Sequence, residues 1–157
     1  MSATRVDRDA VIRRALWASV AFNLGGVLLF AFPDSIGQLA GFPVPVPRIY
    51  TVSLALFVAL FAGAYAWLAR QPEIDRPLVA FAAIGKAGFF TVVAACWLLG
   101  EAPGRGVLGA AGDLVFAVVF AWWLVTTASE QRARPHAVPR GAARDGAATA
   151  ARRLGRG

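Results

Sequence analysis

The most informative segment of the chain is PLVAFAAIGKAGFFTVVAACWLLG, residues 77–100, which carries one charged residue, Lys86. This segment exceeds the roughly 20 apolar residues that cross a ~30 Å hydrocarbon core as a helix. Because backbone amides find no water in that core, a helix is the state that satisfies their hydrogen bonds. The segment therefore predicts a transmembrane helix.

Three more segments of the sequence have the same character. Residues 106–129 carry one charge, Asp113, and residues 15–33 and 49–69 carry none. We therefore predict an all-α, integral membrane four-helix bundle. Its predicted spans are about 14–32, 49–69, 77–99 and 106–127, with a cytoplasmic N-terminal segment at 1–13 and a disordered Arg/Ala-rich cytoplasmic tail at 128–157.

The composition agrees with a membrane protein and excludes several kinds of site. Of the 157 residues 58% are hydrophobic and 16% charged, whereas soluble domains are about 45–50% apolar and about 25% charged. Cys96 is the only cysteine and His136 the only histidine. An internal disulfide, a bis-histidine haem and a Cys/His zinc site are therefore excluded. We predict no cofactor and no metal.

The arginines predict the orientation of the chain. Residues 1–14, the loop after residue 69 and the tail together hold 13 arginines, against Arg48 and Arg105 in the other two loops. The positive-inside rule then places both termini in the cytoplasm, in the inner (plasma) membrane of a bacterium. Arg13-Arg14 before an apolar run also fits a signal peptide, but that run exceeds the 7–15 residues of a signal core. We therefore expect it to remain as the first span.

Two regions outside the spans suggest membrane contacts. In the first loop Asp34-Ser35 could cap a short helix that carries Ile36, Leu39 and Phe42 on the membrane surface, and an irregular loop is the alternative. The basic tail is expected to contact anionic lipid headgroups. Nucleic acid is an unlikely partner, because no aromatic residue is interleaved with the arginines of the tail.

Polar residues inside the spans are the candidates for a site, because ionisable groups there normally face protein or water. Lys86 and Asn23 each lie nine residues into a predicted helix that runs in the same direction, about 13 Å deep. A hydrogen bond between these two is the expected contact. Asp113 lies about 10 Å from the outer surface and Lys86 about 20 Å. This difference disfavours a direct Lys86–Asp113 ion pair without helix tilt or a bridging water.

The candidate site is a small polar pocket that opens outward and binds a small anion, a proton or a polar headgroup. Its predicted residues are Asn23, Tyr50, Ser53, Lys86 and Asp113. The alternative is a buried network that fixes which helices meet, with no ligand. Two ridges of small residues, at Ala55/Ala59/Gly63 and at Gly109/Asp113/Ala117/Ala121, are expected to pack against neighbouring helices.

The layout resembles the small four-helix bacterial membrane proteins of the DoxX-like type over about residues 14–127. The residues that carry this resemblance are Phe22-Asn23-Leu24-Gly25-Gly26, Phe32-Pro33, Gly41-Phe42-Pro43, Gly85-Lys86 and Gly112-Asp113. Many members of that group have no assigned activity, and some are linked to quinone-coupled oxidation of sulfur compounds. The resemblance provides no catalytic residue, and a single thiol argues against disulfide chemistry.

Three classes of function fit these observations. The first is a non-catalytic helper or assembly partner in the inner membrane, alone or as a homo-oligomer. The second is a small oligomeric transporter or channel that uses the intramembrane Asn/Lys/Asp site. The third is a quinone-linked membrane redox component. No catalytic motif is recognisable, so we favour the non-catalytic helper.

Overall fold

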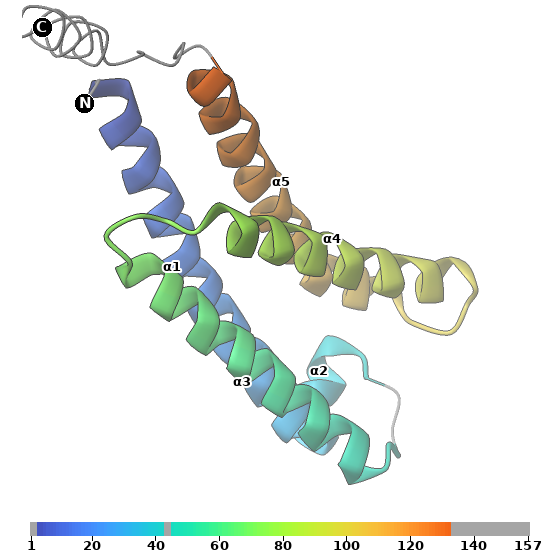
Figure 1. The fold of residues 1–157 in the computed structure, drawn as a ribbon. Coiled ribbons are helices and arrows are strands. Elements are labelled where there is room, and N and C mark those ends of the chain that lie inside the picture. Colours follow the sequence, from blue (N-terminus) through green and yellow to red (C-terminus); the bar gives the residue numbers. More distant parts are fainter. Residues whose placement is uncertain (1–2, 43–44, 133–157) are drawn as a thin grey trace, which may run out of the picture. The chain divides into compact units, whose positions relative to one another are not determined.

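The computed structural model describes residues 3–42 and 45–132, and the secondary structure of these residues is all-helical (Figure 1). Its long helices are α1 (Ala3–Ala31), α3 (Arg48–Arg70), α4 (Arg76–Leu98) and α5 (Gly104–Arg132), and a short π-helical turn, η1 (Pro33–Gly37), and α2 (Gln38–Ala40) lie between α1 and α3. All four long helices are long and apolar enough to cross a membrane. The prediction of a four-helix membrane bundle is therefore confirmed.

The chain divides into two compact units, residues 1–126 and 127–157. The first unit holds α1, α3, α4 and most of α5, and every contact described below lies within it. The predicted tail, residues 128–157, lies largely outside the described residues. Its first five residues continue α5, which ends at Arg132.

Helix α1 also extends beyond its predicted span, because it begins at Ala3 instead of near residue 14. The start of the span was predicted from hydropathy, which falls at the charged residues before residue 14. Residues 3–13, however, contain no proline or glycine that would stop a helix. Ile12 in this extension is fully buried, so the N-terminal turns of α1 contribute to the hydrophobic core.

Each long helix buries one stripe of residues at three- and four-residue spacing, as the 3.6-residue period of a helix requires. Along these stripes the buried residues include Ile12, Leu16, Ser19 and Asn23 of α1, Thr51, Ala55, Ala62 and Tyr65 of α3, Val79, Ala82 and Lys86 of α4, and Ala110, Asp113, Ala117 and Phe120 of α5. Polar side chains thus lie in the interior of the bundle.

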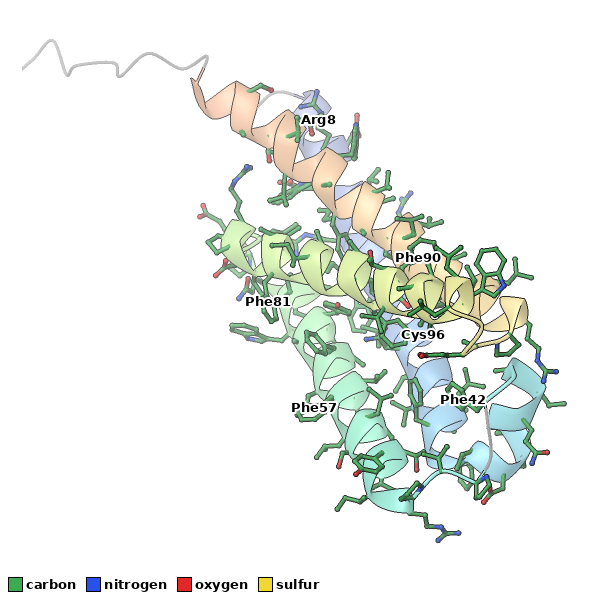
Figure 2. The ribbon with its side chains drawn as sticks, turned by 90° about the vertical axis from the view of Figure 1, so that its right-hand side faces the viewer. Arg8, Phe42, Phe57, Phe81, Phe90 and Cys96 are labelled. Carbon is green, nitrogen blue, oxygen red and sulfur yellow. The ribbon has the colours of Figure 1, made fainter. Side chains whose placement is uncertain are left out.

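The remaining faces of the helices expose large apolar side chains. Phe57 of α3 and Phe81 of α4 are each 57% exposed (Figure 2), and similar residues occur on every long helix. Such faces suit hydrocarbon, where exposed apolar surface has no hydrophobic cost. The structure is that of a multi-pass protein in a lipid bilayer.

The first loop contains the short helical segment, but not the cap or the surface stripe predicted for it. Phe32 occupies the N-cap position of η1 without a side-chain cap, and the Ser35 hydroxyl donates to the Phe32 carbonyl at 3.5 Å. Leu39 is 81% exposed, whereas Phe42 stacks on Phe30 with ring centroids 5.0 Å apart. These residues therefore do not share one face.

The predicted ridges of small residues are only partly buried. Asp113 and Ala117 are buried and Gly109 is exposed, and in α3 Ala55 is buried while Gly63 is exposed. A strict four-residue spacing advances about 40° further around the helix at each step, because a turn holds 3.6 residues. Residues twelve positions apart therefore cannot share one contact face.

Arginines hold together the helix ends near the N-terminus of α1. The Arg13 guanidinium donates to the carbonyls of Ala69 at 2.6 Å and Pro72 at 3.0 Å, at the C-terminal end of α3. Arg76 donates to the Leu124 carbonyl of α5 at 2.8 Å. The Arg13 contact is stabilising, because a cation at a helix C-terminus satisfies free carbonyls and opposes the helix dipole. Leu124 lies eight residues before the end of α5, so Arg76 adds a cross-link between α4 and α5 and does not cap a helix.

We expect Arg13→Ala to lower the free energy of unfolding by about 1–2 kcal/mol, because it removes two charge-assisted hydrogen bonds to α3 and its loop. Arg14→Ala is the matched control. Arg14 is exposed and makes no hydrogen bond among the described residues, so its loss should change stability by less than about 0.5 kcal/mol. Unfolding of the full chain in mixed micelles measures both. Equal losses would show that net charge, and not the contact, matters.

Candidate functional site: an intramembrane ion pair

The centre of the bundle holds an ion pair with a third polar partner. The Lys86 ammonium donates to Oδ1 of Asp113 at 2.5 Å and to Oδ1 of Asn23 at 2.9 Å. Asn23, Lys86 and Asp113 are 7%, 4% and 7% exposed. We call these three residues the polar triad. It joins α1, α4 and α5, and the predicted Lys86–Asn23 hydrogen bond is present.

The direct Lys86–Asp113 bond corrects the expectation drawn from depth. Helix α5 begins at Gly104, two residues before its predicted span, and α4 ends at Leu98. Asp113 and Lys86 therefore lie about 14 Å and about 18 Å from the ends of their helices at the loop between α4 and α5, a smaller difference than predicted. The two helices are also inclined to one another (Figures 1 and 2). Distance along a helix is then not depth, and the flexible lysine stem spans the remainder.

Three aromatic rings surround the ammonium. Nζ of Lys86 lies 5.1 Å from the ring centroid of Phe22, 5.3 Å from that of Phe116 and 5.5 Å from that of Tyr65. A cation within about 6 Å of a ring centroid is attracted by the negative face of the ring, most strongly where water is excluded. We call these three residues the aromatic cage. The cage adds α3 to the contacts of the polar triad.

The position of Phe22 depends on a glycine of α5. A Cβ atom built on Gly112 would lie 2.7 Å from Cζ of Phe22 and closer still to its Cε2. Glycine is therefore required for the ring to lie in this place. Gly112 directly precedes Asp113, so one short segment of α5 supplies both the anion and the space for one ring of the cage.

The structure brings together three of the five predicted site residues. Helix α3 is level with the polar triad at Val58, whose carbonyl accepts from Nδ2 of Asn23 at 3.5 Å. Tyr50 lies eight residues before Val58, about 12 Å along the helix, and is 68% exposed. Ser53 lies five residues before Val58, about 8 Å away along the helix. Both belong to the N-terminal part of α3, away from the triad.

Sequence reasoning missed the aromatic cage. Phe22, Tyr65 and Phe116 are ordinary residues of apolar spans, and a ring near a lysine has no signature in a single sequence. Some signal existed for Tyr65, because the hydroxyl of a buried tyrosine usually finds a polar partner. Trp123 lies near the end of the fourth span, where an interfacial anchor would lie, but its ring is buried against protein. It is 4% exposed, and its indole N–H donates to Asp9 at 3.2 Å.

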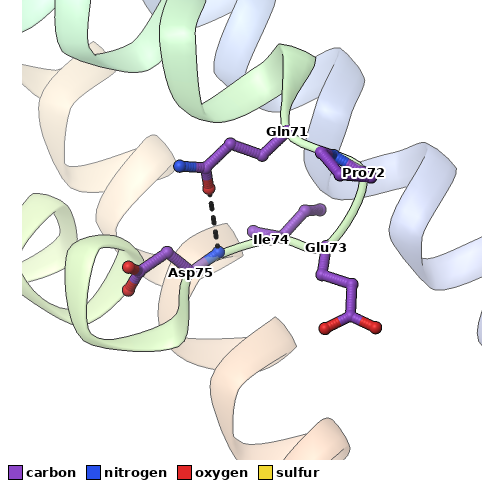
Figure 3. Close-up of a pocket in the computed structure, with 5 residues that line it drawn as sticks. All are labelled: Gln71, Pro72, Glu73, Ile74 and Asp75. Carbon is purple, nitrogen blue, oxygen red and sulfur yellow. Dashed lines mark hydrogen bonds between the residues drawn. The ribbon is translucent and has the colours of Figure 1, made fainter.

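A separate depression lies at the loop between α3 and α4, with a volume of about 640 Å³ (Figure 3). It is lined by Gln71, Pro72, Glu73, Ile74 and Asp75. Its polar groups serve the loop itself: Oε1 of Gln71 accepts from the Asp75 N–H at 3.3 Å, and the Asp75 side chain caps α4 by accepting from the Leu78 N–H at 3.0 Å. None of the triad residues lines this depression.

Four apolar helices around a buried ion pair define a multi-pass helical membrane protein with a charged interior. Within residues 3–42 and 45–132, no group of three or more His, Cys, Asp or Glu side chains is placed to hold a metal ion. A scan against protein-family models, a search of curated proteins and a search of solved structures each returned no match to this chain. The function must therefore be argued from the site.

Proposed function

We propose that the chain is a non-catalytic helper or assembly partner in the inner membrane of a bacterium. The observation that supports this role is the pairing of the two intramembrane charges with each other inside the bundle. The charge of Lys86 is opposed by Asp113, and both residues are more than nine-tenths buried between helices. A closed ion pair of this kind fixes which helices meet, the best-attested role of buried polar groups.

The proposal includes the orientation and the partners predicted from the sequence. Both termini lie in the cytoplasm, and the ends joined by Arg13 and Arg76 face that side. The partner is a membrane protein or a second copy of the chain, bound through exposed apolar helix faces such as that of Phe57. The basic tail contacts anionic lipid headgroups. The layout remains similar to the DoxX-like membrane proteins.

The test is complementation of a deletion strain, read as the abundance of other membrane proteins. A helper needs an intact fold but not its buried charges. We therefore expect a client membrane protein to fall at least twofold in the deletion strain. The full chain and the charge-free variant Lys86→Met/Asp113→Asn should both restore it, whereas Lys86→Met alone, which leaves an unpaired carboxylate, should not.

The second candidate function is a small oligomeric transporter or channel, and the presence of both charges in the middle of the spans favours it. Flux of protons and of chloride into vesicles that contain the purified chain separates this candidate from the helper. We expect no flux above that of protein-free vesicles. Flux that is lost in the folded charge-free variant would replace the helper with a transporter. The quinone-linked redox alternative has no supporting observation in the described residues.

A further inference from the structure

One buried hydroxyl near the polar triad has no partner among the residues that the structure describes. Oγ of Ser19 belongs to a fully buried side chain and makes no hydrogen bond, not even to a carbonyl of its own helix. Serines in membrane helices usually bond to the carbonyl one turn earlier. A buried hydroxyl without any partner costs about 1–3 kcal/mol. An unpaired group of this kind indicates a bound molecule that the protein itself does not supply.

Ser19 lies one helical turn from the polar triad. It precedes Asn23 by four residues on the buried stripe of α1, so their Cβ atoms lie about 6 Å apart. On each of the other three helices we take the residue four positions away, on the same side of the triad as Ser19. These residues are Ala62 (from Val58), Ala82 (from Lys86) and Ala117 (from Asp113). All three alanines are buried, with 4%, 1% and 6% exposure.

One turn from the triad, the four helices therefore carry one buried serine and three buried alanines. Alanine offers no polar side-chain atom, so the partner of Ser19 cannot come from these neighbours. Alanine also has the smallest side chain that carries a Cβ. A guest of a single oxygen atom therefore meets smaller side chains here than larger apolar residues would present.

The polar triad retains hydrogen-bonding capacity beyond the bonds among its own residues. The Lys86 ammonium has three donors, and its described acceptors are Oδ1 of Asp113 and Oδ1 of Asn23. One ammonium proton and Oδ2 of Asp113 are left for another partner. Because the charges of Lys86 and Asp113 cancel, a neutral guest fits the site better than an ion.

We propose that Ser19, Lys86 and Asp113 together bind one water molecule inside the membrane. The water bonds to the Ser19 hydroxyl on one side and, on the other, to the free ammonium proton of Lys86 or to Oδ2 of Asp113. Buried waters typically make about three hydrogen bonds to otherwise unsatisfied polar groups. This site extends the polar triad by one layer and does not depend on the proposed helper role.

The test is magnetisation transfer from water in solid-state NMR of the full chain in lipid bilayers. We expect transfer to Lys86 Nζ in the wild type and at least a twofold loss of it in Ser19→Ala. Ser53→Ala is the control, since Ser53 lies outside this layer and should leave the transfer unchanged. Absence of transfer to Lys86 in the wild type would overturn the proposal.

The sign of the change in thermal stability of Ser19→Ala tests the water site independently. If a water bridges Ser19 to the ion pair, Ser19→Ala removes that bridge and should lower the unfolding midpoint by about 2–4 °C. If the site is dry, the substitution removes an unpaired hydroxyl and raises the midpoint. A raised midpoint would overturn the water site.

Discussion

Replacing Lys86 by methionine should lower the free energy of unfolding by about 3–5 kcal/mol, because it leaves the Asp113 carboxylate buried without a counter-charge. Methionine keeps the length of the lysine stem and its apolar contacts with the aromatic cage. The loss therefore reports the charge and its two hydrogen bonds, at 2.5 and 2.9 Å. Equilibrium unfolding of the full chain in mixed micelles, followed by tryptophan fluorescence, measures it.

The charge-free variant Lys86→Met/Asp113→Asn is the control for this result. Removing both charges together should restore stability to within about 1–2 kcal/mol of the wild type, because replacing a whole buried ion pair is often nearly neutral. The amide introduced at position 113 can bond to Asn23, which loses its lysine partner. If Lys86→Met alone were neutral, the ion pair would contribute nothing to holding α4 and α5 together.

The spans could be predicted from the sequence because hydropathy acts locally. A run of apolar residues such as 49–69 must be helical in a bilayer whatever surrounds it. Pro33 marks the end of the first span and Gly100 the end of the third, because the backbone of each residue disfavours a continued helix. The main misses are the N-terminal end of α1 and the C-terminal end of α5, since charged residues end a hydrophobic run without ending a helix.

The polar triad could be predicted only in part. Lys86 and Asp113 stand out because charges in a span must find partners, and Asn23 shares its depth with Lys86. Tyr50 and Ser53 were included because they lie in the outer half of α3. The structure shows that the level of the triad on α3 is at Val58. A single sequence does not show the tilt and register that determine this level.

The aromatic cage and the role of Gly112 could not be predicted at all. Both depend on where the α1 and α5 surfaces meet, which is decided by the shapes of facing side chains. The spacing of the glycines in α5 does not reveal which of them makes a close contact. Gly109 belongs to the predicted ridge, yet a Cβ atom added to it would meet nothing within 4 Å, whereas Gly112 lies outside the ridge and contacts Phe22.

Gly112→Ala and Gly109→Ala should therefore change stability in opposite directions, although the two glycines lie three residues apart on one helix. Alanine at position 112 must displace the Phe22 ring, and overpacking of this kind costs about 1–3 kcal/mol. At position 109 the added methyl meets open space. Alanine there should stabilise the helix by up to about 1 kcal/mol, its advantage over glycine in helix propensity. The same micelle unfolding measurement compares the two variants.

A second-site substitution separates the clash from any other effect of Gly112→Ala. Phe22→Leu removes the ring atoms that the new methyl meets, so the double variant should regain part of the loss. The cage provides an independent readout, because the ring centroid of Phe22 lies 5.1 Å from Lys86 Nζ. Displacing its ring should shift the NMR resonance of the Lys86 side chain in Gly112→Ala, and Gly109→Ala should leave it unchanged. Equal shifts in both variants would mean that α5 moves as a whole and that Gly112 does not specifically hold Phe22 against the ion pair.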